Sequence, residues 1–153
     1  SAAGARAALL TAVPFVLSAA GALYIGKRSQ ERGERYRHLA IPWFASSALF
    51  FCFSSAASAS PRWGFACLTL AVVGGTAPSA LLNTIAASAS AGPGQAVAMS
   101  FYNAVANLGG LIGPLFIGLV VHHTGVYTVA MHGLGLLLAT AASLVWYMQR
   151  WGL

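Results

Sequence analysis

Residues 103–114 read Asn103-Ala-Val-Ala-Asn107-Leu-Gly-Gly110-Leu-Ile-Gly113-Pro114, inside a long uncharged apolar segment. Asparagines four residues apart lie on the same face of a helix, and an unpaired amide is costly in hydrocarbon. Gly109 and Gly113 allow a close backbone approach, and Pro114 favours a kink. These residues are too polar and too small for a simple membrane anchor. We therefore predict a helix packed inside a bundle, with one face toward a polar cavity.

The composition of the rest of the chain places this helix in a membrane. Of the 153 residues, 58% are hydrophobic and 7% are charged, whereas soluble domains average about 25% charged residues. The net charge of +6 does not indicate a nucleic-acid-binding surface, because seven of the ten charged residues lie between Lys27 and Arg37. A basic cluster between two apolar segments is typical of a cytoplasmic loop. The chain is therefore expected to be an integral membrane protein whose surroundings are a lipid bilayer.

Five windows are long and apolar enough to cross a bilayer, which takes about 20 residues. None of them contains Asp, Glu, Lys or Arg, and they cover residues 7–26, 39–58, 63–87, 96–121 and 127–148. The only long polar loop is predicted at 27–38, and short connections favour antiparallel neighbours. We predict an all-α bundle of five transmembrane helices, with residues 1–153 forming one domain.

The distribution of cations predicts the orientation of the bundle. Six of them, Arg150 and five between Lys27 and Arg37, lie on one side, against Arg6 and Arg62 on the other. The positive-inside rule then places the C-terminus in the cytoplasm. The Ala-rich composition and tight loops favour the plasma membrane of a bacterium, its inner membrane. A span begins almost at Ser1 and the number of spans is odd, so we expect the chain to be a fragment.

Two sections resemble a known family. The section from Gly26 to His38 is similar to the loop between the eighth and ninth helices of major facilitator superfamily transporters, closest to the anion:cation symporter branch. The residues that match are Ser29, Gly33, Glu34, Arg35 and His38. The second section resembles the eleventh helix and following turn of the same branch, through Asn103, Asn107-Leu-Gly-Gly110, Gly113-Pro114, Gly118 and Thr124-Gly125-Val-Tyr127.

This resemblance implies the eighth to twelfth helices of a twelve-helix transporter, hence a partial C-terminal half. The partners that it implies are the missing N-terminal half, a small organic anion and a coupling cation such as the proton. The substrate site of such folds lies near the midplane between the halves, and access alternates between the two sides. The branch usually has Phe-Trp-x-x-Pro at the end of the tenth helix, where this chain has Leu82-Asn83-Thr84-Ile85-Ala86.

The candidate site residues fall into two groups on the third and fourth spans. Asn83, Tyr102, Asn103 and Asn107 are candidates for lining the substrate cavity. The alternative is that the amides bond neighbouring helices as packing contacts and that Tyr102 fills the core. The second group is expected to mediate helix packing or bending during transport and comprises Gly109, Gly110, Gly113, Pro114 and Gly118.

The basic loop supplies a further candidate. Arg32 or Arg35, flanked by Gly26 and Gly33, could pair with a carboxylate or a helix C-terminus and latch one transport state. A charge-assisted pair of this kind shifts an equilibrium by about 1 to 3 kcal/mol. The alternative is a solvated loop that only sets topology.

Little in the sequence supports catalysis. Glu31 and Glu34 are the only acids and lie in one loop, so acid/base chemistry lacks its usual groups. The four histidines lie at different depths without a carboxylate nearby, which does not indicate a metal site. We expect no enzyme activity and no cofactor. The leading hypothesis is a secondary active transporter, and the alternative is a non-transporting structural or assembly protein, or an inactive transporter remnant.

Overall fold

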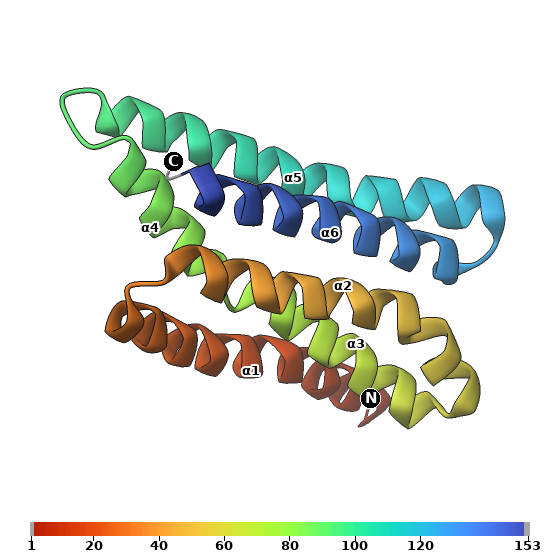
Figure 1. The fold of residues 1–153 in the computed structure, drawn as a ribbon. Helices are drawn as coiled ribbons and strands as arrows, with labels where there is room; N and C mark the ends of the chain where they lie inside the picture. Colours follow the sequence, from red (N-terminus) through yellow and green to blue (C-terminus); the bar gives the residue numbers. More distant parts are fainter. Residues whose placement is uncertain (1, 152–153) are drawn as a thin grey trace.

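The computed structural model describes the backbone of residues 2–151, and within that range every side chain except those at positions 2, 3, 6 and 7. Arg6 and Ala7, which entered the predicted topology, therefore have side chains outside the described part, and so does the C-terminal residue, Leu153. The described chain is helical almost throughout (Figure 1). Its helices are α1 (Ala2–Arg32), α2 (Arg35–Ala59), α3 (Pro61–Thr76), α4 (Ser79–Ala89), α5 (Gln95–Thr124) and α6 (Tyr127–Trp151).

The predicted fold class, an all-α membrane bundle, is confirmed. Five helical stretches are long and apolar enough to cross a membrane, and the third of them, Pro61–Ala89, combines α3 and α4. This stretch is interrupted at Ala77 and Pro78, between the end of α3 and the start of α4. Pro78 has no N–H and its ring would clash with the carbonyl four residues earlier in a continuous helix. The Ala77 amide still donates to the Val73 carbonyl at 2.9 Å, and a new helix begins at Ser79.

The prediction of a long polar loop at 27–38 is wrong. The first helix continues through Arg32 and the next begins at Arg35, so only Gly33 and Glu34 separate them. Charged side chains end an apolar window but not a helix, and ion pairs three residues apart support both helix ends. Arg28 lies 3.8 Å from Glu31, and Arg37 lies 3.2 Å from Glu34. Gly33 makes the turn with φ of +67°, a conformation that favours glycine.

The helices form a row rather than a closed bundle. In order, α1 packs on α3, α3 on α2, α2 on α6 and α6 on α5, while α4 crosses the row and contacts α1, α2 and α5 (Figure 1). The buried cluster joins α2, α4 and α6 and consists of Leu39, Ala40, Trp43, Leu81, Ile85, Ala142 and Val145.

The two helices at the ends of the row, α1 and α5, are largely exposed. The prediction that the helix of residues 103–114 is packed inside a bundle is therefore wrong for this chain, because α5 lies at the edge and buries no residue.

Small residues hold the centre of the row together. A Cβ added at Gly64 of α3 would lie 2.9 Å from the Ala57 Cα of α2, and one at Gly135 of α6 would lie 3.1 Å from the Phe51 ring. The Ser47 hydroxyl donates to the Gly135 carbonyl at 2.7 Å, and the Trp43 indole N–H donates to the Gly75 carbonyl at 2.9 Å. Close backbone approach and hydroxyl bonds across helices are the usual means of association in membranes.

Candidate functional site

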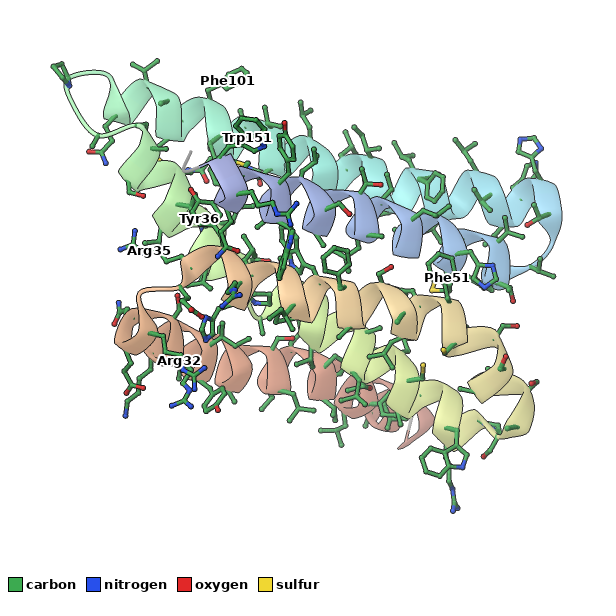
Figure 2. All side chains as sticks on the ribbon, viewed as in Figure 1. Arg32, Arg35, Tyr36, Phe51, Phe101 and Trp151 are labelled. Carbon is green, nitrogen blue, oxygen red and sulfur yellow. The ribbon has the colours of Figure 1, made fainter. Side chains whose placement is uncertain are left out.

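Helix α5 has two faces of different character. Counting 3.6 residues per turn places a polar and small face on one side, made of Ser100, Asn103, Asn107, Gly110, Pro114 and Gly118. A bulky face is centred about a third of a turn away and includes Val97, Phe101, Leu108, Leu115 and Leu119, each at least half exposed. Figure 2 shows Phe101 on the outer side of α5, pointing away from α6. The side toward α6 is a third surface and includes Phe116, whose ring lies against Gly133 of α6.

The two asparagines of α5 are exposed and lack partners. Neither the Asn103 nor the Asn107 side chain hydrogen-bonds to any residue that the structure describes, and both are exposed. They therefore do not act as packing contacts between helices of this chain. Tyr102 is half-buried. The polar face of α5 is free to meet water, a substrate or another polypeptide.

Asn83 is carried by α4, the other arm of the α4–α5 hairpin. It is exposed and, like the asparagines of α5, has no side-chain hydrogen bond among the described residues. At 1.5 Å per residue, Asn83 lies about 9 Å from the end of α4, and Asn103 lies about 12 Å from the start of α5. Both amides therefore lie about two helical turns from the connection between α4 and α5, although the structure shows no contact between them.

The predicted packing glycines make no close contact within the described chain. A Cβ added at Gly109, Gly110, Gly113 or Gly118 would meet no described atom within 4 Å. The contact between α5 and α6 is instead made by Gly133 of α6, where an added Cβ would lie 2.7 Å from the Phe116 ring. α5 also continues without interruption through Pro114. As contact positions, these glycines remain a prediction for a surface outside this chain.

The basic junction between α1 and α2 does not form the predicted latch on its own. Glu31 and Glu34 pair with Arg28 and Arg37, which leaves Arg32 and Arg35 without an acidic partner in the described residues. Both side chains lie at the α1–α2 junction in Figure 2. Arg32 lies in the last turn of α1, where the helix dipole favours a cation.

The glycines of this junction differ in their role. Gly33 makes the turn between α1 and α2, whereas Gly26 lies inside α1, with no described atom within 4 Å of an added Cβ. The backbone therefore requires glycine at position 33 and shows no such requirement at position 26.

The remaining titratable groups do not gather into a site. The Nδ1 atom of His38 lies within hydrogen-bond distance, 2.7 Å, of the Glu34 carbonyl oxygen. The ring centroids of His132 and Phe51 are 5.3 Å apart. His122 and His123 contact each other at the end of α5, with their ring centroids 5.4 Å apart. Across residues 2–151, as far as their side chains are described, no three His, Cys, Asp or Glu side chains are close enough to hold a metal ion.

Sequence reasoning missed two features that the structure shows. The closely packed glycines are Gly21, Gly64, Gly74, Gly133 and Gly135 rather than those of α5. Their only signal in the sequence is small size, which the glycines of α5 share. A pair of adjoining hollows also lies between α2 and α6, lined partly by Trp146 and Arg150. Residues far apart in the chain form these hollows, so no local motif marks them.

Comparison with known proteins gives one informative match. The chain is 28% identical over 116 residues to a quinolone resistance transporter of Acinetobacter baumannii. The match covers 76% of this chain and 26% of the relative, so the chain spans about a quarter of that protein's length. No family model matches the chain, and no solved structure matches it. The five apolar helices and this similarity identify a multi-pass membrane protein related to a transporter.

Proposed function

We propose that the chain is part of a secondary active transporter of the major facilitator type, which moves a small organic anion with protons or another cation by alternating access. The observation that carries the proposal is the polar face of α5, where Asn103 and Asn107 are exposed and unpartnered at the open end of the helix row. The similarity to a transporter supports the same class of function.

The free-energy cost of placing two unpaired amide side chains in lipid argues against a lipid-facing position for this side of α5. Moving an amide from water to a solvent without hydrogen bonds costs about 4 to 8 kcal/mol, and nothing in the described chain offsets it. A water-filled cavity or a second set of polar helices removes this cost. The helices at both ends of the row, α1 and α5, bury little of their surface. We propose that both contact the N-terminal half of a longer transporter and that the polar face of α5 lines the cavity between the halves.

The chemistry of these residues fits a carboxylate substrate. An asparagine NH₂ group donates two hydrogen bonds, and a carboxylate accepts them. Between residues 39 and 148 the only charged side chain is Arg62, at the start of α3. The cation that pairs with the substrate and the group that carries the coupling proton are therefore assigned to the other half.

The junction of α1 and α2 has a separate role in this proposal. In it, Arg32 or Arg35 pairs with a carboxylate or a helix C-terminus of the N-terminal half and favours one of the two transport states. The positive-inside rule places this junction and the C-terminus in the cytoplasm. The location that we propose is the plasma membrane, the inner membrane of a bacterium.

Uptake into membrane vesicles tests the proposal. The full coding sequence that contains this chain is expressed with Asn103→Ala, Asn107→Ala or Thr140→Ala, and uptake of labelled organic acids, a quinolone included, is measured across an imposed proton gradient. Thr140 is the matched control, because it is exposed on α6 and bonds only the Leu136 carbonyl of its own helix at 2.8 Å.

We expect the asparagine variants to lose most of the uptake at equal expression and the control to keep it. Loss of one hydrogen bond to a charged substrate costs about 1.5 to 3 kcal/mol, equivalent to about a tenfold to hundredfold weaker apparent affinity. Uptake at the wild-type level in both asparagine variants would remove α5 from the substrate path. No uptake of any organic acid by the wild type would favour a non-transporting membrane protein.

A further inference from the structure

We propose that an anionic phospholipid binds in the groove between the first turns of α2 and the last turns of α6. A hollow of about 470 Å³ lies there, lined by Ile41, Phe44, Ser143, Trp146, Tyr147 and Arg150. A second hollow of about 340 Å³ adjoins it and shares Ile41 and Trp146. The second hollow is lined by the charged groups of the α1–α2 junction, which are Arg32, Glu34, Arg37 and His38. The two hollows together form one site with an apolar part and a basic part.

The basic part has cations available for an anion. Three arginines line the two hollows, and the only acid among the lining residues is Glu34. That carboxylate is already paired with Arg37 at 3.2 Å. Arg32 and Arg150 form no ion pair with any described acid. A guanidinium group binds a phosphate oxygen pair through two parallel hydrogen bonds, so the site favours a phosphate-bearing ligand.

The apolar part indicates that this ligand carries acyl chains. The side chains of Ile41, Phe44, Trp146 and Tyr147 line the first hollow and are 38 to 57% exposed. Tryptophan and tyrosine at the end of a transmembrane helix mark the level of the lipid head groups. Free phosphate would contact only the arginines, whereas a phospholipid covers both parts of the site. Basic pockets between transmembrane helices bind anionic head groups in this way.

In Figure 2, Arg32 lies at the α1–α2 junction and Trp151, the residue after Arg150, lies at the end of α6. The groove is formed by α2, α6 and the end of α1, whereas the proposed substrate path uses α5. The lipid site therefore does not depend on the proposed function, and its test uses no transport measurement.

Native mass spectrometry of the purified chain tests the lipid site. The chain in detergent is titrated with phosphatidylglycerol or with phosphatidylcholine of the same acyl chains. We expect phosphatidylglycerol to bind more tightly. Removing one cation with Arg150→Gln should weaken its binding about fivefold, the equivalent of roughly 1 kcal/mol per basic side chain, and leave phosphatidylcholine unchanged. Arg32→Gln repeats the test from α1, and Arg62→Gln is the matched control, an exposed arginine without an ion pair at the start of α3.

Two further measurements separate the parts of the site. Ser143 is exposed in the apolar hollow, so Ser143→Phe should occupy it and weaken the binding of both lipids. Inorganic phosphate at millimolar concentration should fail to displace phosphatidylglycerol. The proposal is overturned if the wild type binds both lipids equally, if Arg62→Gln weakens binding as much as Arg150→Gln, or if free phosphate displaces the lipid completely.

Discussion

The contact between α2 and α3 at Gly64 makes a quantitative prediction about the centre of the helix row. In Gly64→Ala the new Cβ would lie 2.9 Å from the Cα and 3.0 Å from the Cβ of Ala57. Ordinary carbon contacts are about 3.5 to 4.0 Å, so the two helices must separate by more than half an ångström. The obstacle is backbone and a methyl group, and neither can rotate away. The substitution therefore strains the contact between two core helices.

The expected loss follows from two opposing terms. Overpacking costs about 1 to 3 kcal/mol, and a backbone obstacle places this site in the upper part of that range. Replacing a helical glycine by alanine returns about 1 kcal/mol through helix propensity. The net change is a loss of about 1 to 2 kcal/mol in the free energy of unfolding, a factor of about 5 to 30 in the unfolding equilibrium.

Unfolding of the purified chain in mixed detergent micelles, followed by tryptophan fluorescence as SDS is added, measures this loss. The control is Gly110→Ala on α5, where an added Cβ meets no described atom within 4 Å. The control should be neutral or stabilised by up to about 1 kcal/mol. If Gly64→Ala is as stable as the control, the close contact between α2 and α3 does not exist in the folded protein.

Two other predictions separate packing within the chain from packing against a partner. Ser47→Ala removes the 2.7 Å bond to the Gly135 carbonyl and should lower the unfolding free energy by about 0.6 kcal/mol. Ser143→Ala, whose hydroxyl bonds only its own helix, should change it little in the same assay, and equal effects would contradict the reasoning. Gly110→Leu should not lower the stability of the isolated chain but should reduce uptake by the proposed full-length transporter about tenfold, through overpacking of about 1 to 3 kcal/mol against the other half. Unchanged uptake would show that the small face of α5 contacts no other helix.

The parts of the fold that depend on local chemistry could be predicted from the sequence. Apolar segments of about 20 residues required transmembrane helices, and the spacing of Asn103 and Asn107 placed both on one face of α5. The failed predictions concern contacts between distant segments. A glycine in α5 has the same local signal as Gly64 or Gly135, yet only the latter two meet another helix. Which glycines contact another helix depends on which helices are neighbours in the row. That arrangement cannot be derived from the local sequence around each glycine.

The wrong loop prediction has a different cause. Hydropathy measures where the membrane ends, whereas helix ends depend on backbone conformation and capping. The charged residues after Gly26 remain helical outside the apolar window, and the chain turns only at Gly33. The sequence shows the proline at position 78, but a proline can either kink a helix or divide it in two. Which of these occurs depends on the packing of neighbouring helices.

The central claim is that the polar face of α5 borders water in the assembled transporter. Asn107→Cys and Leu108→Cys, made separately after replacing Cys52 and Cys67 by alanine, test it most directly. The two positions lie about 1.5 Å apart along the helix axis and about 100° apart around it, so depth is matched and only the face differs. The rate of reaction with a charged, membrane-impermeant thiol reagent is measured in membranes that contain the full-length protein. We expect rapid labelling at position 107, slowed by substrate, and slow labelling at 108. Equally slow labelling at both positions would contradict it.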